Sequence, residues 1–210
     1  MARISSTDRR AELVQAAMRV ISAHGVAAAT TRAIVAEAGM SLASFHYAFR
    51  SRDEMMRELL TLVVESEAAA VFETLRPGAD IRSSLRNGLQ AYFDLLVADP
   101  SHEQVVFELT HYALRTPGLE VLAREQYARY HEAVGELLTA GAAAAGVEWS
   151  IPVADVARTV VTYTDGVTLA WLADRDSAAA HRILDFAADS LAALTRVRTT
   201  AHARPTESVK

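Results

Sequence analysis

Hydrophobic residues recur at every third or fourth position through most of the chain, which is the spacing of an amphipathic α-helix. The first such stripe predicts a helix that begins near Ser6 or Thr7 and closes at Gly25. Its apolar face is formed by Leu13, Ala17, Val20, Ile21 and His24.

Residues 30–54 predict two short helices separated by a tight turn, followed by the start of a third. Threonines at 30 and 31 open the first, where a hydroxyl can cap free backbone N–H groups. Gly39 ends it, where a left-handed residue is often needed, and Ser41 caps the next. The stripe of that second helix consists of Phe45 and Phe49. A turn of about 3–4 residues containing glycine is typical of a helix-turn-helix.

The remaining pattern is also helical. Arg52 opens a long helix that continues to about Leu75 and joins the first part of the chain to the rest without a flexible linker. The predicted helices beyond it are Ile81–Asp99, Ser101–Arg115, Leu119–Gly141, Val153–Ala173 and Ser177–Thr195, with Ser101 and Ser177 as caps. We expect no strand.

The predicted fold is therefore all-α, with about nine helices: three in an N-terminal helix-turn-helix unit and the others in a C-terminal bundle. The division we expect is residues 1–51 for the helix-turn-helix domain, 52–198 for the C-terminal bundle domain, and 199–210 for a polar, disordered tail.

Composition narrows the setting. The chain has 210 residues, of which 51% are hydrophobic and 22% are charged, and it contains no cysteine, so disulfides and thiolate metal sites are excluded. No apolar run is long enough for a membrane span, and the N-terminus lacks the apolar core of a signal peptide. We expect a cytoplasmic protein.

The net charge of −5 is unevenly distributed. Residues 1–60 contain eight arginines and six acidic residues, a formal charge of +2, whereas the remainder holds 13 basic and 20 acidic residues, a charge of −7. Positive charge therefore gathers where the helix-turn-helix lies, as DNA binding requires.

At this motif the chain resembles the TetR/AcrR family of bacterial transcription regulators. The residues that carry the resemblance, all at the spacing of that family, are Thr30-Thr31-Arg32, Ala38-Gly39-Met40-Ser41, the aromatic patch ending in Phe49, and Ser51-Arg52-Asp53. The chain departs from the family pattern at five positions: Val35 stands where a small alanine is usual, Leu42 where a lysine is frequent, His46 where a tyrosine is common, Ala48 where a histidine or tyrosine is common, and Arg50 where a proline is common.

The resemblance implies a set of DNA contacts. Phosphate contacts are expected from Thr31, Arg32, Tyr47 and Arg52, with Ser41 at the helix start. Leu42, Ala43, Ser44 and His46 would face the major groove, the first two through apolar contact and the last two through hydrogen bonds. The alternative is that Thr31 and Ser41 only cap helices and that Arg52 is only a solvated surface residue.

The bundle carries candidates for a small-molecule site. Aromatic and histidine side chains fall on three of its helices, namely Phe107, His111, Tyr127, Tyr130, His131, Tyr163 and Trp171. Such a set suits a largely apolar cavity with a few polar groups, and related regulators place an inducer cavity in this region. A packed aromatic core explains the same residues.

The last two helices predict self-association. The helix after Val153 has one apolar face through Val156, Val160, Tyr163, Val167 and Trp171, and a second, opposed face through Val161, Thr168 and Leu172. In resembling proteins the last two helices form a four-helix dimer interface, and a twofold dimer matches a palindromic operator. A monomer that buries both faces internally is the alternative.

Enzyme chemistry finds little support, since the sequence has no phosphate-binding glycine loop, no His-Glu-x-x-His metal motif and no nucleophile elbow. We expect no catalytic residue, no metal and no cofactor. The interpretation is a dimeric, ligand-responsive regulator of an operator in double-stranded DNA, most simply a repressor. A DNA-binding regulator without small-molecule control and an α-helical enzyme remain the alternatives.

Overall fold

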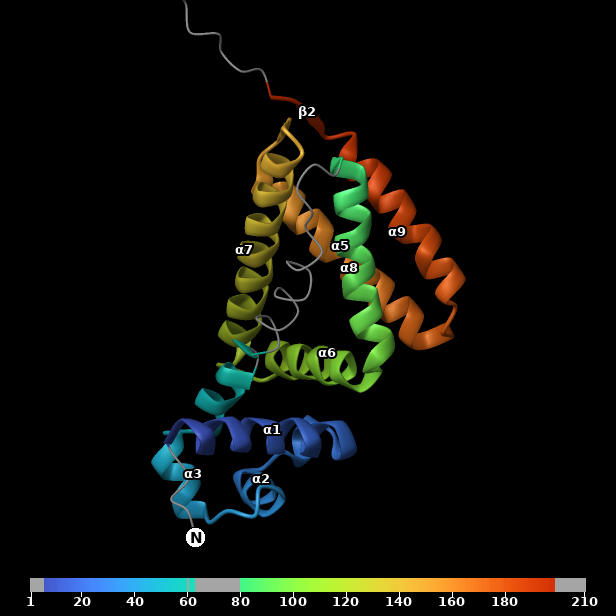
Figure 1. Ribbon diagram of the computed structural model, residues 1–210. Helices are drawn as coiled ribbons and strands as arrows, with labels where there is room; N and C mark the ends of the chain where they lie inside the picture. The colour runs from blue at the N-terminus through green and yellow to red at the C-terminus, as the bar shows by residue number, and fades with distance from the viewer. Residues whose placement is uncertain (1–5, 60, 63–79, 199–210) are drawn as a thin grey trace, which may run out of the picture.

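The computed structural model describes residues 6–59, 61–62 and 80–198, and these are almost entirely helical. A small helical unit at the N-terminus lies at one end of the molecule, and a larger bundle occupies the other (Figure 1). The all-α prediction is confirmed.

The N-terminal unit consists of α1 (Ser6–His24), the short 3-10 helix η1 (Val26–Ala28), α2 (Thr31–Glu37) and α3 (Leu42–Ala48). Its core is formed by fully buried side chains that include Leu13, Ile21, Ile34, Phe45 and Phe49. His24, which the pattern assigned to the apolar stripe of α1, is instead exposed, because it is the last residue of the helix and lies beyond this core.

Residues 52–59 and 61–62 are helical and follow directly after α3. Met55 and Leu59 are fully buried in the same hydrophobic cluster as α1, α2 and α3. The start of the helix predicted from Arg52 is therefore part of the N-terminal core. The rest of that prediction, toward Leu75, lies outside the described residues.

The bundle is built from α5 (Ile81–Ala98), α6 (Pro100–Arg115), α7 (Glu120–Ala144), α8 (Val153–Asp174) and α9 (Ser177–Ala192). Its core contains Phe93 from α5, Trp171 from α8, and Leu184 and Leu191 from α9. The ring centroids of Phe93 and Trp171 are 5.8 Å apart in an edge-to-face arrangement. Helix α6 lies at the end of the bundle that faces the N-terminal unit, next to α1 (Figure 1).

Two predicted caps are wrong by one or two residues. The cap of α6 is Asp99, whose carboxylate accepts from the backbone N–H of His102, and Ser101 instead donates its hydroxyl to that carboxylate. The cap of α9 is Asp176, which accepts from Ala179 N–H at 2.9 Å. In each case an aspartate before the predicted serine competes successfully, because a carboxylate is a strong acceptor for a helix N-terminus.

The prediction that the chain contains no strand is also wrong. β1 (Val147–Trp149) pairs antiparallel with β2 (Thr195–Val197), so that Val147 faces Val197 and Trp149 faces Thr195. The pairing ties the end of α9 to the α7–α8 connection. Strands of three residues are too short to show an alternating pattern in the sequence.

Among the described residues, no helix is long and apolar enough to cross a membrane.

Candidate DNA-binding surface and ligand cavity

The helix-turn-helix is defined by its caps. The hydroxyl of Thr30 accepts a hydrogen bond from Ala33 N–H at 3.2 Å, and that of Ser41 accepts one from Ser44 N–H at 3.1 Å. Between the two helices Gly39 has a φ of 62°, the left-handed conformation that glycine adopts without strain. These local interactions define where α2 and α3 begin and how the chain turns between them.

The recognition helix α3 has one buried and one exposed face. Phe45 and Phe49 are fully buried. Opposite them, Tyr47 is 71% exposed and Leu42 is 42% exposed, and His46 also faces solvent.

The other predicted DNA contacts in this region lie around the same face. Ser41, Ala43 and Arg32 are exposed, whereas Thr31 and Ser44 are half-buried. The hydroxyls of Ser41 and Ser44 are 3.0 Å apart, so Ser44 takes part in the cap of its own helix.

Arg52 lies differently from the phosphate contact that we expected. Its guanidinium donates to two backbone carbonyls of the η1–α2 turn, Ala29 O at 2.7 Å and Val26 O at 2.8 Å. It also donates to the hydroxyl of Tyr112 on α6 at 3.3 Å. These bonds engage the guanidinium inside the protein and join three segments.

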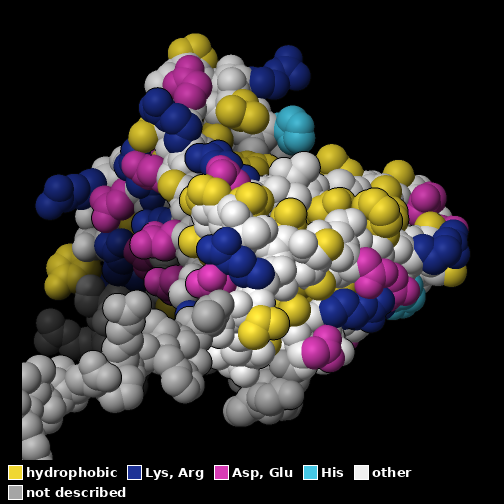
Figure 2. All heavy atoms as spheres, turned by 90° about the horizontal axis from the view of Figure 1, so that it is seen from above, with side chains coloured by type: hydrophobic (Ala, Val, Ile, Leu, Met, Phe, Trp, Pro, Cys, Tyr) yellow, Lys and Arg dark blue, Asp and Glu magenta, His cyan; other side chains and the backbone are white. Residues whose placement is uncertain are grey.

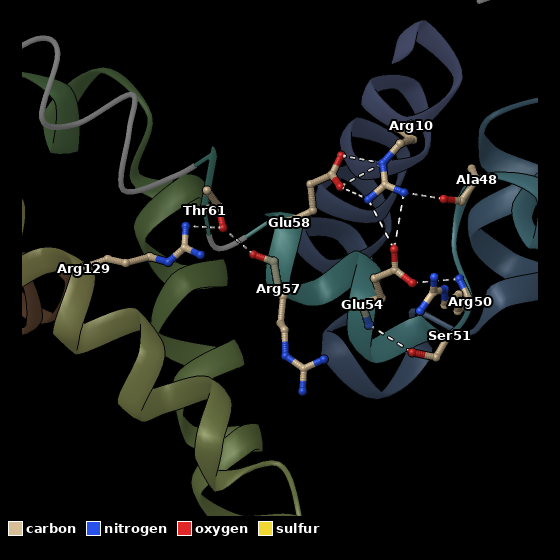
Figure 3. Close-up of polar contacts among 9 residues, drawn as sticks. All are labelled: Arg10, Ala48, Arg50, Ser51, Glu54, Arg57, Glu58, Thr61 and Arg129. Carbon is tan, nitrogen blue, oxygen red and sulfur yellow. Dashed lines mark hydrogen bonds and ion pairs between the residues drawn. The ribbon is translucent and has the colours of Figure 1, made fainter. Parts of the chain in front are cut away.

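Two further arginines near the N-terminus of α1 contact the recognition helix. The guanidinium of Arg9 lies 5.2 Å from the ring centroid of Tyr47. Arg10 donates to the carbonyl of Ala48 and pairs with Glu54 and Glu58, as Figure 3 shows. Neither arginine is among the contacts predicted from the sequence, where their only signal is the excess of arginine in residues 1–60.

The hydrogen bonds and ion pairs around Arg10 shift the pKa values of the groups that take part. Hydrogen bonding to Glu58, together with the charges of Glu58 and Glu54, raises the pKa of the Arg10 guanidinium. The pKa of Glu54 is lowered, chiefly by a hydrogen bond from Arg50 N–H and then by Arg10. Arg10 thus holds the start of α1 against the end of α3 and the helix that follows.

The bundle encloses a cavity of about 140 Å³. Helices α5, α6, α7 and α8 provide most of its wall, and the wall is mainly apolar. The lining residues are Ile81, Ser84, Leu85, Gly88, Leu89, Tyr92, Glu103, Val106, Phe107, Thr110, Gln126, Tyr127, Tyr130, Ala133, Val134, Leu137, Leu138, Gly141, Val160, Val161, Thr164, Asp165 and Leu191. A concave apolar site with a few polar groups is what small-molecule binding requires.

Three of the seven predicted ligand residues, Phe107, Tyr127 and Tyr130, line this cavity. The other four are not in its lining. Trp171 is buried in the core against Phe93, and Tyr163 packs partly buried against the same core. His111 is exposed with its ring nitrogen 2.8 Å from Phe107 O, and His131 lies behind Tyr127, with ring centroids 6.1 Å apart.

Polar groups of the cavity wall are joined in pairs across helices. The hydroxyl of Tyr127 donates to Asp165 at 2.8 Å, and the hydroxyl of Tyr92 lies 3.4 Å from Glu103. Burial raises the pKa of the Tyr127 hydroxyl, and the Asp165 carboxylate raises it further, so Tyr127 stays a protonated donor.

A third pair joins Thr110 to Gln126 at 2.8 Å, and Tyr92 also contacts the hydroxyl of Thr168 at 2.7 Å. Glu103, Gln126 and Tyr92 are not among the ligand residues predicted from the sequence. The sequence signal for such residues is a polar side chain at helical spacing from a predicted cavity residue. Glu103, for example, lies four residues before Phe107 and therefore on the same face of the helix.

The two sites are mechanically connected. On α6, Val105, Leu109 and Ala113 belong to the hydrophobic cluster of the N-terminal unit, while Phe107 and Thr110 line the cavity. On α7, Arg129 donates to Thr61 at 2.6 Å (Figure 3). Two of the four helices that form the cavity wall, α6 and α7, therefore contact the N-terminal unit directly.

Seen from above, acidic and basic side chains alternate with hydrophobic ones over the described atoms, without a broad patch of one sign (Figure 2). Within the described residues, no group of three or more His, Cys, Asp or Glu side chains is arranged to hold a metal ion.

Comparison with known proteins identifies both parts of the chain. Residues 13–59 match the model of bacterial regulatory proteins of the tetR family, and residues 81–196 match that of the C-terminal part of BetI-type transcriptional repressors. The chain is 31% identical over 172 residues to the nicotine-responsive transcriptional repressor HdnoR of Paenarthrobacter nicotinovorans, covering 82% of this chain and 88% of that protein.

Solved structures agree with this match. The multidrug binding protein EbrR, determined in complex with imidazole, is 29% identical, with a TM-score of 0.65 over 91% of this chain and 97% of that one. A TetR-family regulator from Rhodococcus sp. is 19% identical and has a TM-score of 0.74, covering 88% and 98% of the two chains, which indicates a common fold.

Proposed function

The chain belongs to the TetR family of transcription regulators, and we propose that it is a dimeric repressor released from a palindromic operator by a small molecule bound in the cavity. Relatives support ligand control: HdnoR is a nicotine-responsive repressor, and EbrR is a multidrug binding protein. We also propose that the protein has no catalytic activity and that it acts in the cytoplasm.

The observation that carries the DNA-binding role is the exposed face of α3. Tyr47 and Leu42 are exposed there although the opposite face of the same helix is fully buried. We propose that Leu42, Ala43, Ser44 and His46 contact base edges, and that Thr31, Arg32, Ser41 and Tyr47 hold phosphates. We add Arg9, whose guanidinium lies beside Tyr47, to the residues proposed to contact phosphates. Arg52 is proposed to stabilise the η1–α2 turn through its hydrogen bonds and not to contact DNA.

The functional division of the chain is proposed to fall at Arg52, where the helix after α3 begins. Residues 1–51 read DNA and residues 52–198 bind ligand and a second copy. Because Met55 and Leu59 lie in the N-terminal core, the first turns of that helix move with the DNA-binding unit.

Dimerisation is proposed through α8 and α9. The second apolar face expected on α8 does not supply the interface, because Val161 and Thr168 are buried inside the chain. We propose instead the face that carries the exposed apolar side chains of these two helices, Leu169 on α8 and Ile183 and Phe186 on α9. A twofold pairing of this face would place two α3 helices on successive turns of one side of the DNA.

We propose that a bound ligand releases the protein from its operator through α6 and α7, since each helix has one side in the cavity and another against the DNA-binding unit. A ligand can weaken operator binding only to the extent that it binds the DNA-incompetent arrangement more tightly. A regulator without small-molecule control would lack this response.

The test is a mobility-shift titration with DNA upstream of the gene for this protein, followed by selection from random or genomic DNA. A twofold-symmetric site bound by wild type but not by the Tyr47→Ala variant is the expected result. Val97→Ala, an exposed apolar substitution on α5, is the control. If selection returns no preferred sequence, the DNA-binding role is refuted. The titration is then repeated in the presence of small organic compounds, and if none of them affects the protein–DNA complex, ligand control is refuted.

A further inference from the structure

The side chain of Gln126 combines deep burial with an unused hydrogen-bonding group. Gln126 lies on α7, lines the bundle cavity and is only 2% exposed. Its amide oxygen accepts a hydrogen bond from the hydroxyl of Thr110 on α6 at 2.8 Å. Within the part of the chain that the structure describes, the Gln126 side chain makes no other hydrogen bond. Both N–H groups of its amide nitrogen are therefore left to donate to a further partner.

A buried amide N–H group without a partner costs free energy, because folding has removed it from water. Buried polar groups in native proteins are accordingly hydrogen-bonded in the great majority of cases. Since Gln126 belongs to the cavity wall, a molecule inside the cavity can supply the acceptor that its amide nitrogen requires. The position of this side chain thus selects for a ligand with a hydrogen-bond acceptor.

The rest of the wall indicates the body of such a ligand. The lining is mainly apolar and includes Val106 and Phe107 on α6 and Val161 on α8. An apolar cavity of roughly 150 Å³ admits a benzene-sized molecule. The cavity of about 140 Å³ therefore suits a compact ligand with one ring and short substituents. An amide N–H is a neutral donor, and its matching group on such a ligand is a neutral carbonyl oxygen.

Gln126 also lies close to the contact between α7 and the N-terminal unit. Leu122 and Ala123, four and three residues earlier on the same helix, are buried in the hydrophobic cluster of that unit. Thr110, the partner of Gln126, follows directly after Leu109 of the same cluster. A carbonyl group bound to Gln126 is therefore held about one helical turn from the residues through which α6 and α7 contact the DNA-binding unit.

We infer that the effector of this protein carries a neutral carbonyl group on a compact apolar body, and that the amide nitrogen of Gln126 donates a hydrogen bond to the carbonyl oxygen. This inference rests on the proposed function, because it uses the same cavity. It adds the residue that determines specificity and the chemical group that this residue recognises.

Calorimetric titration of the purified full chain with acetophenone and α-methylstyrene tests the inference. The two compounds have the same shape, but a methylene group in α-methylstyrene replaces the carbonyl oxygen of acetophenone. Because they also differ in hydration, the quantity to compare between proteins is the ratio of the two affinities. That ratio, ketone over hydrocarbon, is expected to fall about fivefold in Gln126→Met, which keeps the length of the side chain but has no N–H donor.

The affinity for α-methylstyrene should be retained in Gln126→Met, which also establishes that the variant is folded. Gln126→Leu lacks the donor as well and provides the same comparison should the methionine variant not fold. Gln104→Met on α6 is the matched control, since Gln104 is exposed and outside the cavity lining. This control should leave the affinity ratio unchanged.

Two results would overturn the inference. If the affinity ratio in Gln126→Met equals that of wild type, Gln126 does not recognise the carbonyl group, although binding of α-methylstyrene still supports a ligand site in the cavity. If neither compound binds wild type, the inferred ligand class is wrong. Operator binding of the same preparation, measured without any compound, then decides separately whether the proposed DNA-binding function also fails.

Discussion

The carboxylate of Glu108 accepts a hydrogen bond from the backbone N–H of Val26 at 2.7 Å, which joins α6 to the turn that precedes α2. From the other side, Arg52 donates to the carbonyl of the same Val26. One residue of the η1 turn is thus held by a helix of the bundle and by the helix that follows α3. A displacement of α6 therefore reaches the base of the helix-turn-helix directly.

Gly25 is required at this junction. Its φ of 80° and ψ of 164° lie in a region open essentially to glycine alone, and a Cβ there would lie 2.9 Å from Glu108 Oε1. We expect Gly25→Ala to lower the free energy of unfolding by about 1–3 kcal/mol, measured by urea denaturation.

Gly135→Ala is the matched control for this substitution. Gly135 lies inside α7, where a Cβ would meet no other atom within 4 Å apart from its chain neighbours and the backbone of its own helix, so the variant should be more stable by about 0.5–1 kcal/mol. Equal effects of the two substitutions would mean that the η1 turn is not held as described.

Glu108→Ala should weaken the coupling between cavity and operator. Loss of one hydrogen bond is expected to cost about 1 kcal/mol of stability, and the ratio of operator affinities without and with an effective ligand should move toward one. Fluorescence anisotropy with labelled operator measures that ratio. Glu132→Ala, at an exposed position of α7, should leave the ratio unchanged.

The recognition helix should divide into two kinds of contact. Tyr47→Ala should weaken binding about equally for all DNA sequences, because it removes a phosphate contact. His46→Ala or Ser44→Ala should relax preference at one base position, by about 1–3 kcal/mol. Competition binding against a set of single-base operator variants distinguishes these results, and uniform effects from all three variants would contradict the division.

The dimer interface is tested at Phe186, which is 64% exposed on α9. We expect Phe186→Glu to shift the protein from dimer to monomer at low micromolar concentration, measured by sedimentation equilibrium, because a charge at a buried interface lacks a partner. Leu114→Glu is the control, since Leu114 is similarly exposed but lies on α6. A dimer that persists in Phe186→Glu would place the interface elsewhere.

Asp99 should make the stability of α6 depend on pH. The hydroxyl of Ser101, followed by the N–H of His102, lowers the pKa of the Asp99 carboxyl. The folded state therefore favours the ionised form, and the stabilisation is present above the usual pKa of aspartate and is lost as pH falls through the lowered pKa.

The comparison for this prediction is Asp99→Asn, which keeps a good capping side chain but cannot titrate. Its urea-unfolding free energy should match wild type near neutral pH and fall less steeply on acidification. Parallel pH profiles would remove Asp99 as a source of the dependence. Asp155→Asn on α8 controls for a general loss of carboxylate.

Much of this organisation follows from the sequence by itself. The spacing of Leu13, Ile34, Phe45 and Phe49 already requires helices that bury one face, and Gly39 with Ser41 requires the turn between them. These features are local: they depend on residues within about one or two helical turns of each other. They were enough to indicate the all-α fold and the helix-turn-helix.

Contacts between distant residues needed the tertiary structure. Tyr127 and Trp171 look alike as aromatic residues in helical register, yet only Tyr127 lines the cavity while Trp171 packs against Phe93. Which side of a helix meets a cavity depends on how it is rotated against its neighbours, and that rotation is set by the packing of the whole bundle.

The same reason explains Arg52 and Glu103. The sequence placed Arg52 correctly at a helix start, but not its bonds to Val26 and Ala29, which come from a turn more than twenty residues earlier. In the sequence Glu103 is an ordinary charged residue of a helix, and only the packing of α5 against α6 places Tyr92 beside it. Periodicity along the chain determined the helices, whereas packing between helices decided which side chains form the sites, because side-chain partners are fixed by distance in space and not by spacing in sequence.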